Sequence, residues 1–497
     1  MPKIGSLEAP GNGREASCHN HKRRSITRGS WATSTPLIVR PAAGAGQVLD
    51  REKQERMAAE GPRGTLALRL SERFFYGWAM VVVAALVLFA TGPGQSHTFS
   101  VFIGPIGESL GISATAVSSA YAIATLAAAF GLPYVGRLVD RYGVRRVLLV
   151  VASLFGLAAV AFGAVGGMVG LALGFAALRF LGQGSLMLCS ANLVAQWFSR
   201  RRGFAMSLMG LGFSASVAAH PPLAQWLIDT VGWREAWLWL GLMTWLLLLP
   251  PLLLLVQDKP EDMGLEPDGT AAEARDAASD AARAAEVGLT AGQALRTRTF
   301  WIIAVSLATL SMLVTGLFFH QVSIFSSLGL SAQLAASIFP ISAITTVLAM
   351  PVIGRLLDRL PTRPVFAAAM LAMSAAMITL TLVRDMPSAI AYAVVFGIAN
   401  AGIHTHIHYL WPRYFGRRHL GSIQGTAQTI GVIGASLGPL PFGVAFDLFG
   451  SYAGALWLFA LQPVLCAAAI LLMRPPRLDG PSVHTGGGPP APPESRR

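Results

Sequence analysis

The sequence has little charge. Only 13% of its 497 residues are Asp, Glu, Lys or Arg, whereas a soluble globular chain carries about 25%. Hydrophobic residues make up 53%, so too little polar material remains to cover a surface that faces water. The composition therefore excludes an ordinary soluble domain and favours a chain that crosses a membrane several times.

Cysteine and lysine are also scarce. The three cysteines, Cys18, Cys189 and Cys466, are scattered and form no CxxC pair, so the sequence predicts neither a disulfide framework nor a zinc knuckle. Only four of the 38 basic residues are lysine. The sequence contains no GxxxxGK[ST] loop, which argues against a pump driven by ATP.

Long apolar runs are abundant. A membrane-spanning helix needs about 20 consecutive, mostly apolar residues. Twelve segments meet this requirement, at residues 77–103, 114–135, 147–167, 170–195, 204–228, 236–256, 300–325, 333–353, 365–384, 388–411, 421–446 and 452–473. The sequence therefore predicts an all-α membrane protein with twelve transmembrane helices.

Polar segments divide these runs into two bundles of six helices. The predicted parts are a disordered cytoplasmic N-terminal arm (1–72), an N-terminal bundle (73–256), a cytoplasmic linker (257–299), a C-terminal bundle (300–474) and a disordered cytoplasmic tail (475–497). Within the arm, Met57 is an alternative start of translation, which the intact mass of the purified protein would identify.

The arginines predict the orientation of the chain. Thirteen of them lie in loops on one side of the predicted membrane, at positions 137, 141, 145, 146, 200, 201, 202, 355, 359, 363, 413, 417 and 418. The loops on the other side contain only Arg234 and Arg384. By the positive-inside rule, both termini lie in the cytoplasm of a multi-pass protein of the plasma (inner) membrane. Arginines in such turns do not indicate a nucleic-acid partner.

The two halves repeat with a constant offset. "GRLVDRYGVRR" begins at Gly136 and "GRLLDRLPTRP" at Gly354. The same offset relates three more pairs, Pro221 with Pro439, Asp229 with Asp447, and Trp239 with Trp457. Six helices return each half to its starting side, so the repeat is parallel. Transporters built in this way place their binding site between the halves, near the middle of the bilayer.

Over residues 75–474 these features resemble the major facilitator superfamily. The first copy of the repeated loop matches the family's signature between helices 2 and 3, at Gly136, Asp140, Arg141, Gly143 and Arg146. The second copy keeps Gly354, Asp358, Arg359 and Arg363, but has Pro361 in place of the second glycine. "RFLGQG" is similar to the family's helix-4 motif, with Arg179 as its arginine and Gly184 as its glycine.

Four further stretches resemble the bacterial monocarboxylate/oxalate–formate-like branch of that superfamily. They are "YGW", "GWREAW", "KPEDMGLEPDG" and "PRYFGRRHLGSIQG". Carriers of this branch often place a basic residue in helix 8 or helix 11, whereas spans 333–353 and 421–446 contain no charge here. The resemblance implies a secondary transporter and leaves its substrate open.

The signature loop has a mechanical interpretation. Asp140 can accept hydrogen bonds from the N-terminal amides of a neighbouring helix and pair with the arginines beside it. Such contacts would hold a cytoplasmic gate closed and break when the halves rock, with Asp358 and Arg359 acting in the second half. The plainer alternative is that the arginines only set the orientation. Asp140 favours the gate, because orientation requires no acid.

Arg179 is the one formal charge in the cores of the twelve predicted spans, since Arg384 only ends span 365–384, and the cores contain no Asp or Glu. A buried charge marks function or tight pairing. The lack of a buried carboxylate argues against an organic cation as cargo, and the arginine favours an anionic or neutral substrate. The alternative is that Arg179 ties span 4 to backbone carbonyls of span 1.

Other polar residues concentrate on the spans that correspond to the pore helices of the family. With Arg179, the candidate substrate contacts are Gln95, His97, Gln183, His320, Gln321, Asn400 and His404. "HTFSVF" at His97 echoes "HQVSIF" at His320, so we expect these histidines to face each other at similar depth. Since histidine exchanges protons near neutral pH, they are candidates for proton coupling. Alternatively, both cap polar helix ends near the outer interface.

The stretch "IHTHIH" raises the alternative of a metal site. On a helix, residues four apart share a face, so His404 and His408 align while His406 points away. A zinc site needs at least a third protein ligand, and no Asp, Glu or Cys lies near them. We therefore expect His404 to line a pore, and His406 to pack against another helix or the lipid headgroups.

Together these observations predict a secondary transporter that moves a small organic anion through the lipid bilayer by alternating access. We expect a monomer with no cofactor, no metal and no enzymatic activity. The alternatives are an exporter of a neutral or amphipathic compound, a sensor that keeps the carrier fold, and a membrane enzyme that uses the histidines of span 388–411.

Overall fold

The structure is a computed structural model that describes residues 74–474, with gaps at 199–200, 264, 269–287 and 417–418. The predicted N-terminal arm with Met57, the central part of the predicted linker and the predicted tail lie outside the described residues. All described residues belong to one compact unit, Asp50–Arg497.

The first half of the chain contains helices of very different lengths. In order they are α3 (Gly77–Ala90), α4 (Ser96–Phe99), α5 (Ile103–Leu110), α6 (Ala114–Tyr142), α7 (Val144–Phe162), α8 (Gly167–Leu178), the π-helical η2 (Arg179–Leu186), α9 (Met187–Trp197), α10 (Arg202–Val231) and α11 (Trp233–Leu254). We call residues 74–254 the N-half.

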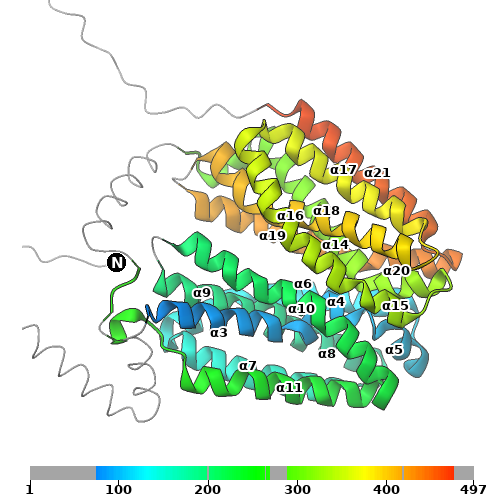
Figure 1. Cartoon of the computed structure of the whole chain (residues 1–497), viewed down its shortest axis with the longest axis horizontal. Coiled ribbons are helices and arrows are strands. Elements are labelled where there is room, and N and C mark those ends of the chain that lie inside the picture. The colour runs from blue at the N-terminus through cyan, green and yellow to red at the C-terminus, as the bar shows by residue number, and fades with distance from the viewer. Residues whose placement is uncertain (1–73, 199–200, 264, 269–287, 417–418, 475–497) are drawn as a thin grey trace, which may run out of the picture. The chain divides into compact units, whose positions relative to one another are not determined.

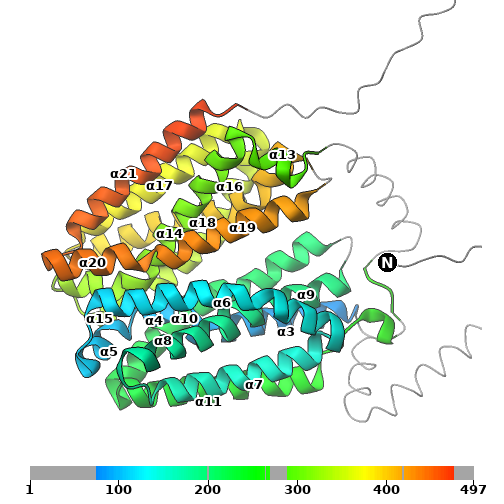
Figure 2. The same cartoon turned by 180° about the vertical axis from the view of Figure 1, so that it is seen from behind.

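The second half repeats this pattern of long helices. Its elements are α13 (Ala291–Leu295), α14 (Arg298–Ser327), α15 (Ala332–Ser337), α16 (Phe339–Arg359), α17 (Thr362–Thr381), α18 (Met386–Phe415), α19 (Leu420–Leu437), α20 (Pro439–Phe449) and α21 (Ala453–Leu472). We call residues 291–474 the C-half. In Figures 1 and 2 the long helices of each half lie side by side, with α6 and α10 of the N-half nearest the C-half.

Eleven helical segments in the described part of the chain are long and apolar enough to cross a membrane. The all-α membrane fold is therefore confirmed, and the count of twelve holds approximately, because the first predicted span is not continuous. It breaks after α3 at the short helix η1 (Gly92–Gly94), and Gln95 that follows is extended. Pro93 lacks an amide hydrogen and its two glycine neighbours are conformationally free, so the α-helical ladder ends here.

Small residues bring the helices of each half close together, as is usual in membranes. A Cβ atom on Gly212 of α10 would overlap the carbonyl oxygen of Ala85 in α3. In the C-half, a Cβ atom on Gly434 would lie 2.6 Å from the carbonyl oxygen of Ala308, so α19 and α14 are in similarly close contact. These contacts make each half a tightly packed body.

Several helices continue further than the sequence predicted, among them α10 and α20. The predicted spans ended at residues 228 and 446, but α10 reaches Val231 and α20 reaches Phe449. The extensions add one acid to each helix, Asp229 and Asp447. The predicted spans ended too early because a window of apolar residues does not register the last polar turn of a helix.

Candidate functional site

Arg179 joins the broken first span to the start of the π-helical η2. Its Nη1 donates to the carbonyl oxygen of Gly94 at 3.2 Å, and its Nε donates to Oγ1 of Thr125 at 3.1 Å. The guanidinium lies over the ring of Tyr121, 4.9 Å from its centroid. The side chain is only 2% exposed. The helix break thus supplies a free carbonyl group, and Arg179 binds it.

Glycines at this crossing let the two backbones meet. A Cβ atom on Gly94 would lie 2.6 Å from the carbonyl oxygen of Leu178, and one on Gly182 would lie 3.3 Å from Cα of Gly94. The helix widens to a π-helix over Arg179–Leu186, and such widened turns are frequent at functional sites.

The charge of Arg179 has no acidic partner among the described residues. A guanidinium carries more N–H groups than the two bonds to Gly94 and Thr125 use. A buried charge that lacks a counter-ion is costly, and an anion brought beside it would reduce that cost.

A second polar group links the start of α4 to the middle of α10. Nε2 of His97 lies 3.4 Å from Oγ of Ser216, and the same Oγ lies 3.1 Å from Nδ1 of His220. All three side chains are buried. The ring of His97 packs against Phe213, and also against Phe318 of the C-half, with centroids 6.0 Å apart.

His320 belongs to a third polar group, which joins both halves. Its Nε2 lies 3.0 Å from the carbonyl oxygen of Pro439 and 3.1 Å from Oγ of Ser118 in the N-half. Its Nδ1 lies 3.4 Å from the hydroxyl of Tyr452. A carbonyl oxygen can only accept, so this geometry is satisfied by a neutral ring with the proton on Nε2.

The expectation that His97 and His320 face each other is wrong. Phe318 is the residue of α14 that contacts His97, and His320 follows it by two positions. Because each helical residue rotates by about 100°, two positions turn the side chain about 200° away. The two histidines were matched by the similarity of their sequences. That similarity does not predict which face of α14 is turned towards α4.

The remaining candidate contacts are spread over both halves. In α14, Gln321 accepts from the hydroxyl of Tyr392 at 3.2 Å. Nδ2 of Asn400 in α18 lies 3.5 Å from Oγ1 of Thr346. Both residues are buried in the packing of the C-half.

Gln95 follows Gly94, which Arg179 binds, and Gln183 lies in η2 together with Arg179. Nε2 of Gln95 donates to Oγ1 of Thr91 at 3.1 Å, and Gln183 is half-buried in η2. His404 is half-buried, with its ring 6.5 Å from that of Phe213. Phe213 is therefore the shared neighbour of His97 and His404.

His404 and His406 of α18 point in different directions, as expected. His406 is buried and stacks on Phe366 of α17, with centroids 4.9 Å apart, so it packs against another helix. The side chain of His408 lies outside the described residues. Within the part of the chain that the structure describes, no group of three or more His, Cys, Asp or Glu side chains could hold a metal ion.

The predicted gate residues lie at the ends of α6 and α16. Gly136 is half-buried in α6, whereas Asp140, Arg141, Arg146, Asp358 and Arg359 are exposed. In this structure neither acid bonds to the N-terminus of a described helix. Gly143 has φ +83°, a left-handed conformation that suits glycine, while its repeat-related Pro361 has φ −57°.

Another acid makes a helix-cap contact of the kind proposed for Asp140, although this contact does not join the two halves. Oδ1 of Asp258, which follows α11, accepts from the backbone amide of Arg145 in the first turn of α7 at 2.7 Å. A Cβ atom on Gly143 would lie 2.8 Å from the same oxygen. This contact could not be predicted from the sequence, because Asp258 lies 113 residues from Arg145 along the chain.

The hydrogen bonds between the two halves lie at one end of the described bundle. The amides of Ala114 and Thr115 donate to Asp447, Ser118 contacts His320, and the amide of Val322 donates to Oγ of Ser100. We call this the Ala114 end. We call the opposite end, which carries the loops with Arg141 and Arg359, the arginine-rich end.

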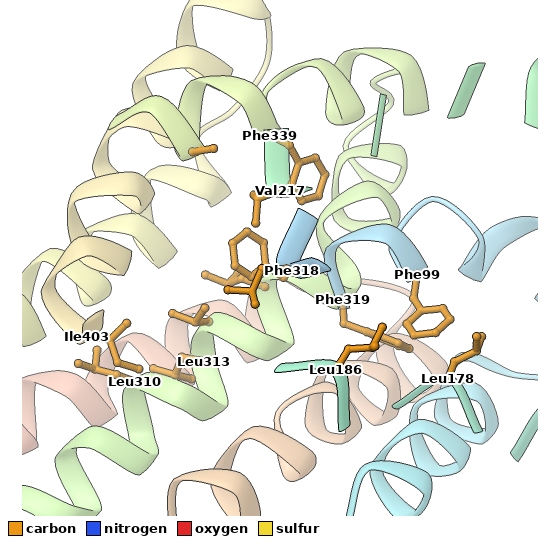
Figure 3. Close-up of a cluster of buried hydrophobic side chains, with 14 of the residues drawn as sticks. Phe99, Leu178, Leu186, Val217, Leu310, Leu313, Phe318, Phe319, Phe339 and Ile403 are labelled. Atoms are coloured by element: carbon orange, nitrogen blue, oxygen red, sulfur yellow. The ribbon is translucent and has the colours of Figure 1, made fainter. Parts of the chain in front are cut away.

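Apolar side chains from both halves form a layer beside these contacts. Figure 3 shows Phe318 close to Val217, and Phe319 close to Leu186. The ring of Phe319 also packs on Tyr121, with centroids 4.4 Å apart. The labelled residues of the layer are Phe99, Leu178, Leu186, Val217, Leu310, Leu313, Phe318, Phe319, Phe339 and Ile403.

Comparison with known proteins supports the predicted resemblance. A family model described as Major Facilitator Superfamily matches residues 84–439 and 315–494. The oxalate:formate antiporter of Oxalobacter formigenes is 26% identical over 238 residues, which cover 47% of this chain and 51% of the antiporter. The chain thus matches only about half of that relative's length.

Two longer matches cover most of the described chain. Monocarboxylate transporter 13 of Bos taurus is 24% identical over 406 residues, 80% of this chain and 89% of that protein. The crystal structure of a D-xylose-proton symporter superposes with a TM-score of 0.61 at 16% identity, covering 80% of this chain and 97% of the symporter. At that identity the structural match reports the fold alone.

Proposed function

Because the chain belongs to the major facilitator superfamily, we propose that it moves a small organic anion across the membrane by alternating access between its two halves. The family and the relatives are membrane transporters, so the chain is a multi-pass transporter and not an enzyme. The relatives named for oxalate, formate and monocarboxylates support an anion as cargo.

The observation that carries this proposal is the buried, uncompensated charge of Arg179. Its bonds to Gly94 and Thr125 hold the guanidinium in place and leave donors for a ligand. A carboxylate could accept from the remaining N–H groups of the guanidinium in a bidentate, charge-assisted contact. The tie to span 1 and the binding of an anion are therefore compatible roles for one side chain.

The structure corresponds to a state that is closed at the Ala114 end. We place the arginine-rich end in the cytoplasm, because arginines concentrate in cytoplasmic loops. The Ala114 end then faces outwards, where Asp447, Ser118 and His320 join the halves. Exposed Asp140 and Asp358 agree with a cytoplasmic gate that is not engaged in this state.

His320 is our candidate for coupling the cycle to protons. It lies between the halves, so rocking that separates Ser118 from it would admit water to the ring. A histidine exposed in this way takes up a proton near neutral pH. The acid near His320 is Asp447 of α20, which is exposed and already accepts from the amides of Ala114 and Thr115.

Uptake into proteoliposomes tests the proposal. A panel of labelled organic anions is offered with and without an inward proton gradient, to wild type and to Arg179→Gln. Arg234→Gln is the matched control, because Arg234 also binds backbone carbonyls, those of Gly163 and Val165, but outside the candidate site. Thermal melting of each variant establishes that it is folded.

We expect uptake that Arg179→Gln abolishes and Arg234→Gln preserves. Equal losses in two folded variants would assign Arg179 to helix packing only. If folded wild type moves no anion, the anion proposal fails, and export of a neutral compound and sensing without transport become the candidates. Counterflow with neutral compounds then separates these two, because a sensor binds its ligand without moving it.

A further inference from the structure

At the Ala114 end, each half of the sequence contains the same pair of features: a serine that caps the N-terminus of a helix, and an aspartate near the end of another helix. Ser113 is the N-cap of α6 and accepts from the amide of Ala116 at 3.2 Å, and Ser331 is the N-cap of α15 and accepts from the amide of Leu334. These two serines occupy equivalent positions of the internal repeat. Asp229 and Asp447 are equivalent in the same way and lie near the ends of α10 and α20.

Asp447 completes the cap of α6 from the other half of the chain. Its Oδ1 accepts from the amide of Ala114 at 3.2 Å, and its Oδ2 accepts from the amide of Thr115 at 2.8 Å. The first amides of a helix have no partner within the helix and carry its positive end. A carboxylate there makes charge-assisted bonds that a neutral group cannot replace. We call this contact the cross-half cap.

Asp229, the repeat-related acid, has a different partner. Its Oδ1 accepts from Nε2 of Gln225, one turn earlier in the same helix, at 2.8 Å. It makes no hydrogen bond to the first turn of α15 among the described residues. The helix pair α10–α15 therefore lacks the cap that joins α20 to α6.

One exchange between the repeats accounts for this asymmetry. The position of Gln225 in α10 corresponds, by the same repeat, to Gly443 in α20. Glycine offers Asp447 no side-chain donor within its own helix, so the carboxylate is available to α6. It also allows close approach, because a Cβ atom on Gly443 would lie 2.6 Å from Oγ of Ser118 and 2.8 Å from the carbonyl oxygen of Ala114.

We propose that the cross-half cap holds the Ala114 end closed and that Asp447, acting through the amides of Ala114 and Thr115, sets the balance between the two states of the transporter. The cap breaks whenever α20 moves away from α6, so its free energy favours the closed end. Only the helix pair α20–α6 has this cap, because Asp229 accepts from Gln225 and does not bind the first turn of α15. This proposal rests on the alternating access proposed above, but its test requires no substrate.

Distances between spin labels measure the balance directly. Ser109 and Ser451 are exposed at this end, in α5 and beside α20, and each is changed to cysteine and labelled in a protein whose native cysteines are serine. Double electron–electron resonance in proteoliposomes then gives the populations of short and long distances. Asp447→Asn is compared with the matched control Asp229→Asn.

We expect Asp447→Asn to raise the ratio of long to short distances by about threefold to tenfold, as for the loss of a charge at a helix N-terminus. Asp229→Asn leaves the ratio unchanged. An unchanged ratio in Asp447→Asn, or an equal shift in both variants, overturns the proposal. The uptake assay on unlabelled wild type reports separately on transport, so failure of the cap and failure of the proposed function are distinguishable.

A variant that keeps the acid provides a second test. Gly443→Ala adds a Cβ atom against Ser118 and Ala114 and so separates α20 from α6 without removing Asp447. The distance ratio rises as it does in Asp447→Asn. Gly454→Ala is the control, because a Cβ atom there meets nothing within 4 Å. If Gly443→Ala keeps the wild-type ratio, the closed state does not depend on the close packing of α20 against α6, which contradicts the proposal.

Discussion

His320 and Ser118 join the two halves of the chain, with 3.1 Å between Nε2 of the imidazole and Oγ of the hydroxyl. The carbonyl oxygen of Pro439, 3.0 Å from the same nitrogen, requires that Nε2 carry the proton. In the alternating access proposed above, the movement of the halves would separate Ser118 from this buried ring and change the surroundings of His320. This arrangement is suited to couple protonation to rocking.

His320→Gln should uncouple transport from protons. A glutamine amide can still donate to the carbonyl oxygen of Pro439, but it does not titrate near neutral pH. A gradient of one pH unit drives up to about tenfold accumulation in a one-proton symport, which corresponds to about 1.4 kcal/mol. We expect the variant to lose this accumulation and keep exchange of labelled for unlabelled anion. Accumulation equal to that of wild type would remove His320 from the coupling mechanism.

Arg179→Lys should weaken substrate binding while the protein stays folded. Lysine keeps the charge. Its single ammonium group cannot reproduce the two hydrogen bonds that the planar guanidinium donates to Gly94 and Thr125. The ammonium group is therefore free to move, and we expect KM for the anion to rise about tenfold, as for the loss of one oriented, charge-assisted contact. Initial uptake rates over a range of anion concentrations give KM. An unchanged KM would show that the planar fork does not orient the anion.

Much of the fold could be predicted from the sequence, because its signals are local or periodic. Apolar runs located the membrane helices, and the repeat at Gly136 and Gly354 located the two halves. The break in the first span was present as Gly92-Pro93-Gly94, but a hydropathy window averages over it.

The contacts of the site were harder to predict, because they depend on helix rotation and on partners distant in the chain. The echo between "HTFSVF" and "HQVSIF" predicted that His97 and His320 face each other, yet Phe318 is the residue that faces His97. Asp258 binds the amide of Arg145 across 113 residues of sequence, and Asp447 binds that of Thr115 across 332 residues. Neither acid lies in a motif that indicates its partner. The two contacts can therefore be identified only from the packing of the helices.

Gly212→Ala should destabilise the N-half. The added methyl group would overlap the carbonyl oxygen of Ala85, so α10 and α3 would have to separate. Overpacking of this kind costs about 1–3 kcal/mol, and we expect a lower melting temperature of the detergent-solubilised protein. Gly210→Ala is the matched control, because a Cβ atom at that position in the same helix meets nothing within 4 Å. Equal melting temperatures in the two variants would contradict the close crossing of α3 and α10.

Asp258→Asn should loosen the arginine-rich end of the N-half. Its carboxylate accepts from the amide of Arg145 at 2.7 Å and so satisfies the first turn of α7. Loss of a helix cap costs about 1 kcal/mol, and the lost charge adds to this cost because the carboxylate lies at the positive end of the helix. Asp262→Asn is the control, since Asp262 is exposed and its side chain has no hydrogen bond among the described residues.

Hydrogen exchange of the backbone amides measures the effect of Asp258→Asn directly in the first turn of α7. We expect the amides of the first turn of α7 to exchange about fivefold faster than in wild type, which corresponds to a loss of about 1 kcal/mol, while Asp262→Asn leaves them unchanged. Protection that is unchanged in Asp258→Asn would mean that another group satisfies the amide of Arg145. Gly143→Ala should increase exchange in the same turn, because a Cβ atom there would lie 2.8 Å from Oδ1 of Asp258 and alanine disfavours φ +83°. Agreement between these two variants would assign to Asp258 the contact that the sequence suggested for Asp140.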